Sequence, residues 1–538
     1  MLSYRKLAMR VLGRPLHTEG IDSPRPASQR AAAFVLTAAM LITLAAPAFA
    51  KEWYIEDGNI TVKAGDTKGT NKVSQGESTD VPDTDTVITN REKNASSNTV
   101  TIEAKDKDDK VEVTLKDVNI DTSSRNKAAV SVTGEGDTNI KLDGDNALKS
   151  DIYRSGIYGS GSGSLTISGG ENDSLTAQGG SGANGISSSG SLTISGGTVT
   201  ANGDDGGRGI SSNGGVTISG GSTVTANGGS GTISGGDGIC SSGGVTISGG
   251  STVTANGGNG GSLVGGDGIR SGGGLTVSDG TVTAKGGNGD SKDGYGGDGI
   301  RSGGVVTISG NTVNAAGGYG GKVGGYGICS FDRVAISGGT VEAAGGNGST
   351  GGGSGIYSSV IDLSGSLELT AKAGSPNGKA LSQKGSELVL DTIKDKLGPG
   401  AKVTATDADG KVIDQVSTPR PVEPEESSSS SDGGSAAPSA PASPLPGLTV
   451  TDKDGQRISY TSTQSGNTLT VCVGRLTASF RISLAALRQL RAEGIETIAF
   501  QTVLCSTTLS VDELLAMGGE NAEAVLTHRF TDSSLTVG

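Results

Sequence analysis

Histidine is almost missing from this chain of 538 residues, which contains His17 and His528 and no other. A Ser-His-Asp triad or a histidine-based zinc site is therefore not expected. Aromatic residues make up 3% of the chain, with a single tryptophan, so few large rings are available to fill a globular core. Four cysteines are too few for a scaffold held together by disulfides.

Glycine, in contrast, is abundant, with 94 residues, and such a composition is compatible with disorder. A repeat argues against disorder here. Its marker is a Gly-Ile pair, and successive markers lie 24 to 31 residues apart. A period of this length indicates a solenoid, propeller or array. The marker isoleucines are Ile157, Ile186, Ile210, Ile239, Ile269, Ile300, Ile328 and Ile356.

Each repeat contains short stretches in which apolar residues alternate with threonine or serine, as in Val245-Thr246-Ile247 and Val253-Thr254-Ala255. Alternation with a period of two is typical of strands. Three short strands per repeat predict a parallel β-helix with about 24–31 residues per turn. One turn alone buries too little apolar surface to offset its loss of backbone entropy, so stability must come from stacking.

The first fifty residues have the layout of a secretory signal. Basic residues precede an apolar run over 31–46, and Ala48-Phe49-Ala50 offers a cleavage site after Ala50. An uncleaved membrane anchor is the alternative, although no second long apolar segment follows. Removal of residues 1–50 would leave 37 basic and 54 acidic residues, a net charge of −17. Such a surface disfavours nucleic acid as a partner.

Composition divides the rest of the chain. We expect an N-terminal cap with the first coils over 51–148, the parallel β-helix over 149–416, a disordered Pro/Ser/Ala-rich linker over 417–447 and a small α+β module over 448–538. In that module Ser483 and Ser510 are placed to cap helices. Cys472 and Cys505 can form a disulfide if their strands are neighbours and the protein is exported.

Three aspartates occupy one position of the repeat, two residues before the marker isoleucine: Asp237, Asp267 and Asp298. In stacked turns their carboxylates would lie about 5 Å apart, which is costly unless the charge is neutralised. The column therefore predicts a calcium site, because calcium accepts several carboxylate and carbonyl oxygens. The alternative is that these aspartates stay hydrated or cap turns in the loops.

Arginine and tyrosine supply the other candidate binding residues. Arg270 and Arg301 directly follow marker isoleucines, beside the aspartate column. There an arginine can act as the base of a polysaccharide lyase, or it can form ion pairs with the aspartates. Tyr295, Tyr319 and Tyr326 lie in the loops of successive turns. They can stack on sugar rings or pack on their own glycine-rich turns.

The repeat unit resembles a known family. Gly266-Asp267-Gly268-Ile269-Arg270-Ser271, Leu275-Thr276-Val277, Thr281-Val282-Thr283-Ala284 and the stretch 113–120 are similar to the bacterial carbohydrate-binding domain-containing proteins built as a polysaccharide-lyase-like right-handed β-helix. The resemblance covers about residues 100–395. It implies a secreted or surface protein that adheres to polysaccharides, with calcium held by the aspartate of the Gly-Asp-Gly-Ile turn.

Together these observations predict an exported, non-enzymatic, monomeric protein that binds a polysaccharide with the help of calcium. Its candidate sugar-binding residues are Tyr295, Tyr319, Tyr326, Arg270 and Arg301. Two alternatives remain open. One is a structural or adhesin-like surface protein for a protein partner, and the other is a calcium-dependent polysaccharide lyase. Release from the cell or loose surface association is expected.

Overall fold

The computed structural model describes residues 50–419 and 448–537, without the short segments 452–456, 459, 466, 474–477, 503–505, 518–521 and 529–532. The chain divides into two compact units, residues 1–424 and 425–538. The predicted signal and most of the predicted linker lie outside the described residues. Within those residues, no helix is long and apolar enough to cross a membrane.

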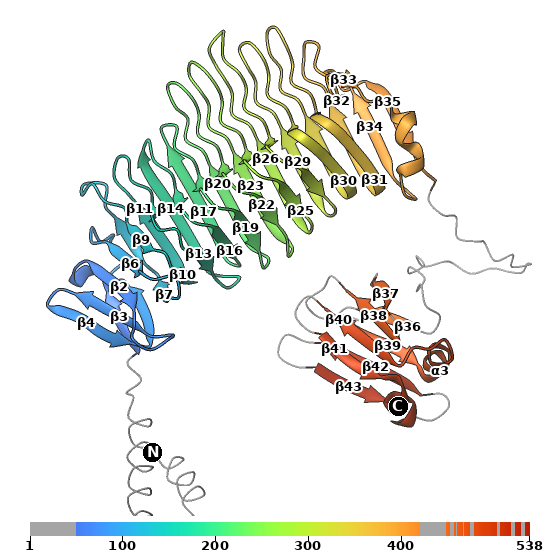
Figure 1. Cartoon of the computed structure of the whole chain (residues 1–538), viewed down its shortest axis with the longest axis horizontal. Helices are drawn as coiled ribbons and strands as arrows, with labels where there is room; N and C mark the ends of the chain where they lie inside the picture. The colour runs from blue at the N-terminus through green and yellow to red at the C-terminus, as the bar shows by residue number, and fades with distance from the viewer. Residues whose placement is uncertain are drawn as a thin grey trace, which may run out of the picture. The chain divides into compact units, whose positions relative to one another are not determined.

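The first unit is a β-solenoid of about 13 turns, which confirms the predicted parallel β-helix (Figure 1). Its strands pair in parallel with strands of the next turn and form three rows. Row one holds the strands with the marker isoleucines and their equivalents. They are β2 (Ile60–Ala64), β6 (Val100–Ala104), β9 (Val130–Gly134), β12 (Ile157–Gly159), β15 (Ile186–Ser188), β18 (Ile210–Ser212), β21 (Ile239–Ser241), β24 (Ile269–Ser271), β27 (Ile300–Ser302), the starts of β30 (Ile328–Ala344) and β31 (Ile356–Lys372), and β32 (Leu381–Gln383).

Row two follows row one in each turn, and row three follows row two. Row two comprises β1 (Ala50–Tyr54), β5 (Asp85–Thr89), β7 (Lys110–Lys116), β10 (Asp137–Asp143), β13 (Leu165–Ser168), β16 (Leu192–Ser195), β19 (Val216–Ser219), β22 (Val245–Ile247), β25 (Leu275–Val277), β28 (Val306–Ile308) and the middles of β30 and β31. Row three comprises β8 (Asn119–Asp121), β11 (Asp145–Lys149), β14 (Ser174–Ser181), β17 (Thr198–Asp204), β20 (Thr223–Asn227), β23 (Ser251–Asn256), β26 (Gly280–Lys285), β29 (Thr312–Ala316), the ends of β30 and β31, and β34 (Lys402–Thr406).

The core is a set of aliphatic columns. All eight marker isoleucines are partners of one another across successive turns, and each is fully buried. The row-three column from Val199 to Val341 is buried in the same way. The predicted period and register are therefore confirmed, because alternation places every second side chain of each strand inside.

Both ends of the solenoid are closed by antiparallel strands. At the start, β3 (Asn71–Gln75) and β4 (Ser78–Asp83) continue from β2, and Pro82 lies in the last of these strands. At the other end, β33 (Ser386–Glu387) and β35 (Val412–Ser417) fold back on β32 and β34, beside the 3₁₀ helix η2 (Leu390–Lys396). Such ends discourage strand pairing with a second solenoid.

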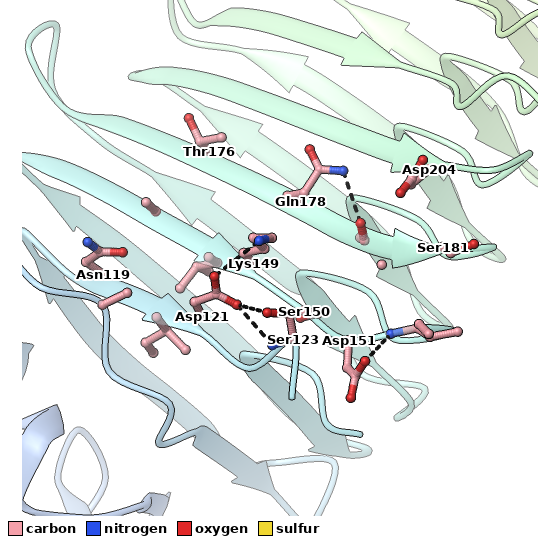
Figure 2. Close-up of a pocket in the computed structure, with 17 residues that line it drawn as sticks. Asn119, Asp121, Ser123, Lys149, Ser150, Asp151, Thr176, Gln178, Ser181 and Asp204 are labelled. Atoms are coloured by element: carbon pink, nitrogen blue, oxygen red, sulfur yellow. Dashed lines mark hydrogen bonds and ion pairs between the residues drawn. The ribbon is translucent and has the colours of Figure 1, made fainter. Parts of the chain in front are cut away.

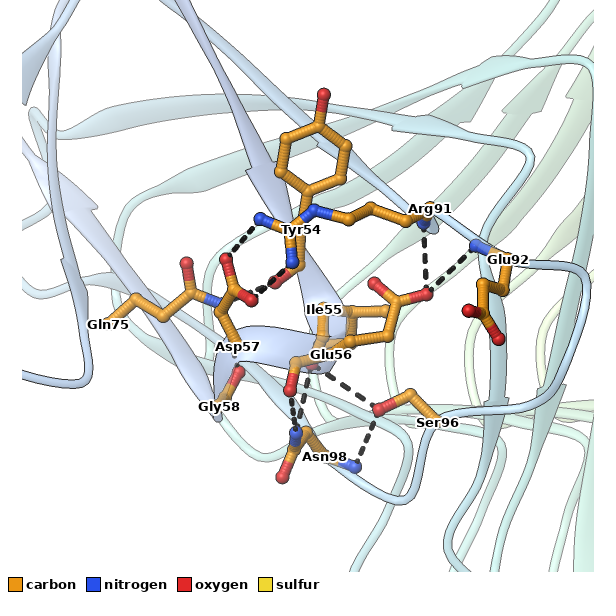
Figure 3. Close-up of polar contacts among 10 residues, drawn as sticks. All are labelled: Tyr54, Ile55, Glu56, Asp57, Gly58, Gln75, Arg91, Glu92, Ser96 and Asn98. Carbon is orange, nitrogen blue, oxygen red and sulfur yellow. Dashed lines mark hydrogen bonds and ion pairs between the residues drawn. The ribbon is translucent and has the colours of Figure 1, made fainter.

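A polar network fixes the first coil at the 3₁₀ helix η1 (Ile55–Asp57), as Figure 3 shows. The Arg91 guanidinium pairs with the Asp57 carboxylate and lies 4.1 Å from the centroid of the Tyr54 ring. The backbone N–H of Arg91 donates to Oε1 of Glu56. The Asn98 amide donates to the carbonyl of Ile55 at 2.9 Å. These contacts tie the first turn to the loop of the next.

The loops that run from row three to row one change length along the solenoid. They have four and five residues after β14 and β17, but 11 to 14 after β20, β23, β26, β29 and β30. Figure 1 shows the longer loops as a row of projections. Glycine backbones bond to each other inside them, as when Gly287 N–H donates to the Gly266 carbonyl at 2.8 Å. A Cβ on Gly287 would lie 2.0 Å from the carbonyl oxygen of Gly258, so this position requires glycine.

The second unit has two four-stranded sheets. Both predicted helices are present. The Ser483 hydroxyl accepts the Ala486 N–H at the start of α3 (Leu484–Ala492), and α4 (Val511–Met517) follows Ser510. The strands are β36 (Leu448–Thr451), β39 (Ala478–Ser483), β42 (Glu523–His528) and β43 (Ser533–Val537) in one sheet, and β37 (Thr461–Ser465), β38 (Thr468–Cys472), β40 (Thr497–Gln501) and β41 (Ser506–Ser510) in the other.

Candidate functional site

The three predicted aspartates form a buried column, here called the carboxylate ladder: Asp237, Asp267 and Asp298. Oδ1 of Asp237 accepts the backbone N–H of Asp267 at 2.9 Å, and Oδ1 of Asp267 accepts that of Asp298 at 2.8 Å. Oδ1 of Asp298 accepts the N–H of Tyr326 at 2.7 Å. Each aspartate is at most 5% exposed. The alternative of hydrated aspartates at loop tips is therefore wrong, because the following turn covers each one.

The second oxygen of each ladder carboxylate faces an arginine. Nε of Arg208 lies 3.2 Å from Oδ2 of Asp237, Nε of Arg270 lies 2.8 Å from Oδ2 of Asp267, and Nη1 of Arg301 lies 3.3 Å from Oδ2 of Asp298. We call Arg208, Arg270 and Arg301 the arginine row. The ion pairs expected from the sequence for Arg270 and Arg301 are confirmed. Arg208, which lies in the preceding turn, was missed, although it occupies the aspartate position of its own repeat.

Burial and mutual repulsion shape the titration of the ladder. Burial raises the pKa of Asp298 to about 7, and the neighbouring Asp267 charge adds to the rise, against the Tyr326 N–H and Arg301. Burial followed by the Asp237 charge also raises the pKa of Asp267, against Arg270. These carboxyl groups thus take up a proton more readily than free aspartate does.

The ladder does not fit a calcium ion. Calcium takes six to eight oxygen ligands, whereas both oxygens of each ladder carboxylate already accept from a backbone amide or face a guanidinium. In the part of the chain that the structure describes, no group of three or more His, Cys, Asp or Glu side chains is arranged to hold a metal. Arginine supplies the positive charge that the sequence suggested calcium would provide, and calcium binding itself stays a prediction.

The three predicted tyrosines do not form one surface. Tyr326 is half-buried, and its ring stacks on that of Tyr357, with centroids 4.9 Å apart. Tyr295 and Tyr319 lie on the long loops and are 43% and 47% exposed. Lys322 Nζ lies 5.6 Å from the Tyr295 ring centroid. Of the three, Tyr326 therefore belongs to the ladder region, and the other two remain open to solvent.

Two of the cysteines, Cys240 and Cys329, lie beside the carboxylate ladder and are poor nucleophiles. Burial raises the pKa of the Cys240 thiol to about 11 and that of Cys329 to about 12, so both stay protonated and weakly nucleophilic. Cys472 is a free thiol 3.4 Å from Oε1 of Gln501. Its strand β38 pairs with β40, which meets the condition that the two strands be neighbours. Cys505 lies outside the described residues, so the disulfide stays a prediction.

A cleft of about 720 Å³ lies on the outer face of row three near its beginning, and we call it the polar cleft (Figure 2). Strands β8, β11 and β14 form its floor, and the turn after β11 forms one side. The cleft lies in the part of the solenoid with short loops. The long loops begin only after β20. Its polar side chains include those of Asn119, Asp121, Ser123, Lys149, Asp151, Thr176, Gln178, Ser181 and Asp204.

Strand register arranges these polar side chains. Asp121, Lys149 and Gln178 are partners on three consecutive strands, and Figure 2 shows their side chains along the floor. Oδ2 of Asp121 accepts from Lys149 Nζ at 3.2 Å, while the Gln178 amide nitrogen donates to the Gly179 carbonyl at 3.0 Å. The cleft thus presents acceptors and donors at intervals of one strand, about 4.8 Å.

Apolar and acidic groups complete the cleft. Ile152, at its edge, is 55% exposed, and the next residue, Tyr153, is 76% exposed. Three aspartates and one lysine line the cleft, Asp121, Asp151, Asp204 and Lys149, and Asp121 forms an ion pair with Lys149. Comparison with protein-family models, with curated proteins and with solved structures finds no match for this chain.

Sequence reasoning missed the polar cleft, although one signal was present. Thr200, Thr225 and Thr254 occupy an outward position in row three, and Thr176 continues this column into the cleft. Two residues further along the strands, Asn202, Asn227 and Asn256 form another outward column. This column continues as Gln178, Lys149 and Asp121 in the earlier turns. The change in this column from asparagine to glutamine, lysine and aspartate marks the cleft.

Proposed function

We propose that the protein binds a polysaccharide outside the cell, without cleaving it, and that the polar cleft is the binding site. The observation that carries this proposal is the in-register set Asp121, Lys149 and Gln178 on the floor of a concave surface. Sugar hydroxyls both donate and accept hydrogen bonds, so they pair with such a mixed set. Export rests on the signal-like first fifty residues.

The repeat of the solenoid favours a polymer over a single sugar. A sugar chain that lies along the solenoid axis meets a new set of protein side chains about every 4.8 Å. The rigid strands hold those side chains in place before binding, which lowers the entropy lost on association. Ile152 offers an apolar contact for the C–H face of a sugar ring. The excess of aspartate over lysine in the cleft favours neutral sugars over uronic acids.

A bulky side chain at Thr176 tests the site. Thr176 is exposed in the cleft, and Thr254 occupies the same outward position three turns later. Isothermal titration with soluble neutral polysaccharides should show binding by the natural protein and by Thr254→Tyr, and at least tenfold weaker binding by Thr176→Tyr. Equal binding by both variants would place the sugar elsewhere.

Adhesion to a protein partner is the second candidate, and the long loops support it. Ile233, Leu263 and Tyr295 lie on successive loops and are 59%, 53% and 43% exposed. Backbone hydrogen bonds align them, from Leu263 to Ile233 at 2.9 Å and from Tyr295 to Leu263 at 2.7 Å. Exposed apolar groups in a row are typical of interaction surfaces. Loss of adhesion to proteins or cells in Ile233→Ser/Leu263→Ser, with unchanged sugar binding, would favour this candidate.

The polysaccharide lyase hypothesis gains no support from the arginines. Burial lowers the pKa of Arg270, but the charges of Asp267 and Asp237 outweigh this and raise it above its usual value. A catalytic base must lose its proton near the working pH. An arginine held between carboxylates therefore serves better as a fixed cation than as a base.

A further inference from the structure

We propose that Arg270 and Arg301 form a second site, which binds tetrahedral oxyanion groups, sulfate or phosphate esters, carried on a polysaccharide. The proposal rests on the proposed polysaccharide-binding function but uses a different surface, the outer face of row one. The two arginines are Cα partners on β24 and β27. Their side chains therefore leave the backbone about one strand spacing, 4.8 Å, apart, and each guanidinium is held by the aspartate of its own turn.

Each guanidinium is oriented by a buried carboxylate and keeps N–H donors that make no hydrogen bond within the described residues. Arg270 bonds to Asp267 through Nε, and Arg301 bonds to Asp298 through Nη1. Among the described residues, no group accepts a hydrogen bond from the two Nη nitrogens of Arg270, or from Nε and Nη2 of Arg301. Both side chains are partly exposed, at 43% and 38%. The free donors are thus available to a ligand in solution.

The charge pattern favours an anion at this place. The carboxylates that balance the arginines are buried, at most 5% exposed, whereas the guanidinium groups reach the surface. The residues that flank the pair along the same column, Cys240 and Cys329, carry no charge. Two cations one strand apart repel each other, and an anion between them relieves that repulsion. The outer face of the pair is therefore positive, in a chain with net charge −13.

The stacking of the two guanidinium groups selects the shape of the anion. A carboxylate is planar, and its two oxygens match the fork of a single guanidinium. A sulfate or phosphate ester has three terminal oxygens that point in different directions. It can accept from both guanidinium groups at once across the strand spacing. Phe331, whose ring centroid lies 5.2 Å from the Arg301 guanidinium, closes one side with an apolar surface.

The test uses four polymers with one backbone: dextran, carboxymethyl-dextran, dextran sulfate and phosphorylated dextran, immobilised for biolayer interferometry. The natural protein should bind the sulfated or the phosphorylated polymer at least tenfold more tightly than the other two, and the one it prefers identifies the source of the oxyanion. Arg270→Gln/Arg301→Gln should lose this preference. Arg333→Gln, which removes a surface arginine paired with Asp362, should keep it.

Loss of both arginines leaves Asp267 and Asp298 buried without the cations that pair with them, which can prevent folding. The variant Asp267→Asn/Asp298→Asn/Arg270→Gln/Arg301→Gln removes both signs of charge and should fold and fail to bind. Unchanged binding in this folded variant, or equal binding of carboxymethyl-dextran, overturns the proposal. Thr176→Tyr should leave binding to the preferred charged polymer unchanged. Failure of the polar cleft to bind neutral polysaccharides is therefore distinguishable from failure of the arginine site.

Discussion

The backbone N–H of Asp298 donates to Oδ1 of Asp267, one turn earlier in the solenoid, at 2.8 Å. Asp267 stands in the same relation to Asp237, and Tyr326 to Asp298. Each acidic side chain thus ties its own turn to the backbone of the next. These hydrogen bonds strengthen the stack. Because an ionised carboxylate is costly to bury, the stability of the stack also depends on whether the ladder carboxyl groups are protonated.

Stability should fall as the pH rises from about 4 to 7. Burial raises the pKa of Asp298 to about 7, so in this window the folded state holds a proton that the unfolded chain has released. The free energy of unfolding then decreases with pH. The Asp298→Asn variant keeps an amide oxygen for the Tyr326 N–H, as Asn184 does for Arg208 at 2.8 Å.

Melting temperatures of the natural protein and of Asp298→Asn, measured from pH 4 to 8, check this prediction. From pH 4 to 7 the free energy of unfolding should decrease by about 1–3 kcal/mol less in the variant than in the natural protein. The matched control is Asp332→Asn, which changes an exposed carboxylate. A natural protein that is equally stable across the range would show that the ladder stays ionised in the fold.

Calcium should leave the stability of the solenoid unchanged. Both oxygens of each ladder carboxylate are already engaged, and a ligand raises the melting temperature only when it binds the folded state. Differential scanning fluorimetry in millimolar calcium and in chelator measures the effect. A melting temperature that calcium raises in the natural protein, but not in Asp267→Asn/Asp298→Asn, would restore the calcium site predicted from the sequence.

Gly287→Ala should strongly destabilise the long loops. The added Cβ would lie 2.0 Å from the Gly258 carbonyl oxygen, within the stack of glycine backbones. Overpacking of this kind costs about 1–3 kcal/mol or more. Gly215→Ala is the control, because its Cβ would lie 3.4 Å from the nearest atom. Chemical denaturation of the two variants compares them, and equal stabilities would contradict the close packing.

The repeat made most of the solenoid predictable. The columns of Ile and Val recur in phase, and parallel pairing then leaves one register that buries them all. The same register brought Asp237, Asp267 and Asp298 together, as expected. Their burial was not predictable, because it depends on how the loop after row three covers the start of row one. The polar cleft was missed for a related reason: it lies where those loops are short, before the long loops begin after β20.

The stack of Tyr326 on Tyr357 shows another limit. The two residues occupy different positions of the repeat, one before the marker isoleucine and one after it. Their contact depends on side-chain directions that a register alone does not give. Tyr326 was expected to offer a free ring to sugars, yet one of its faces packs against Tyr357. Sequence spacing therefore identified the candidate residues better than it identified their surroundings.

A polysaccharide microarray probed with the natural protein, Thr176→Tyr and Thr254→Tyr, each in calcium and in chelator, tests whether the polar cleft binds sugar chains. We expect the natural protein and Thr254→Tyr to bind one class of neutral polysaccharide equally in both buffers, and Thr176→Tyr not to bind it. Binding by Thr176→Tyr at the natural level, or no neutral polysaccharide bound by any of the three proteins, would contradict the polar cleft as a polysaccharide-binding site.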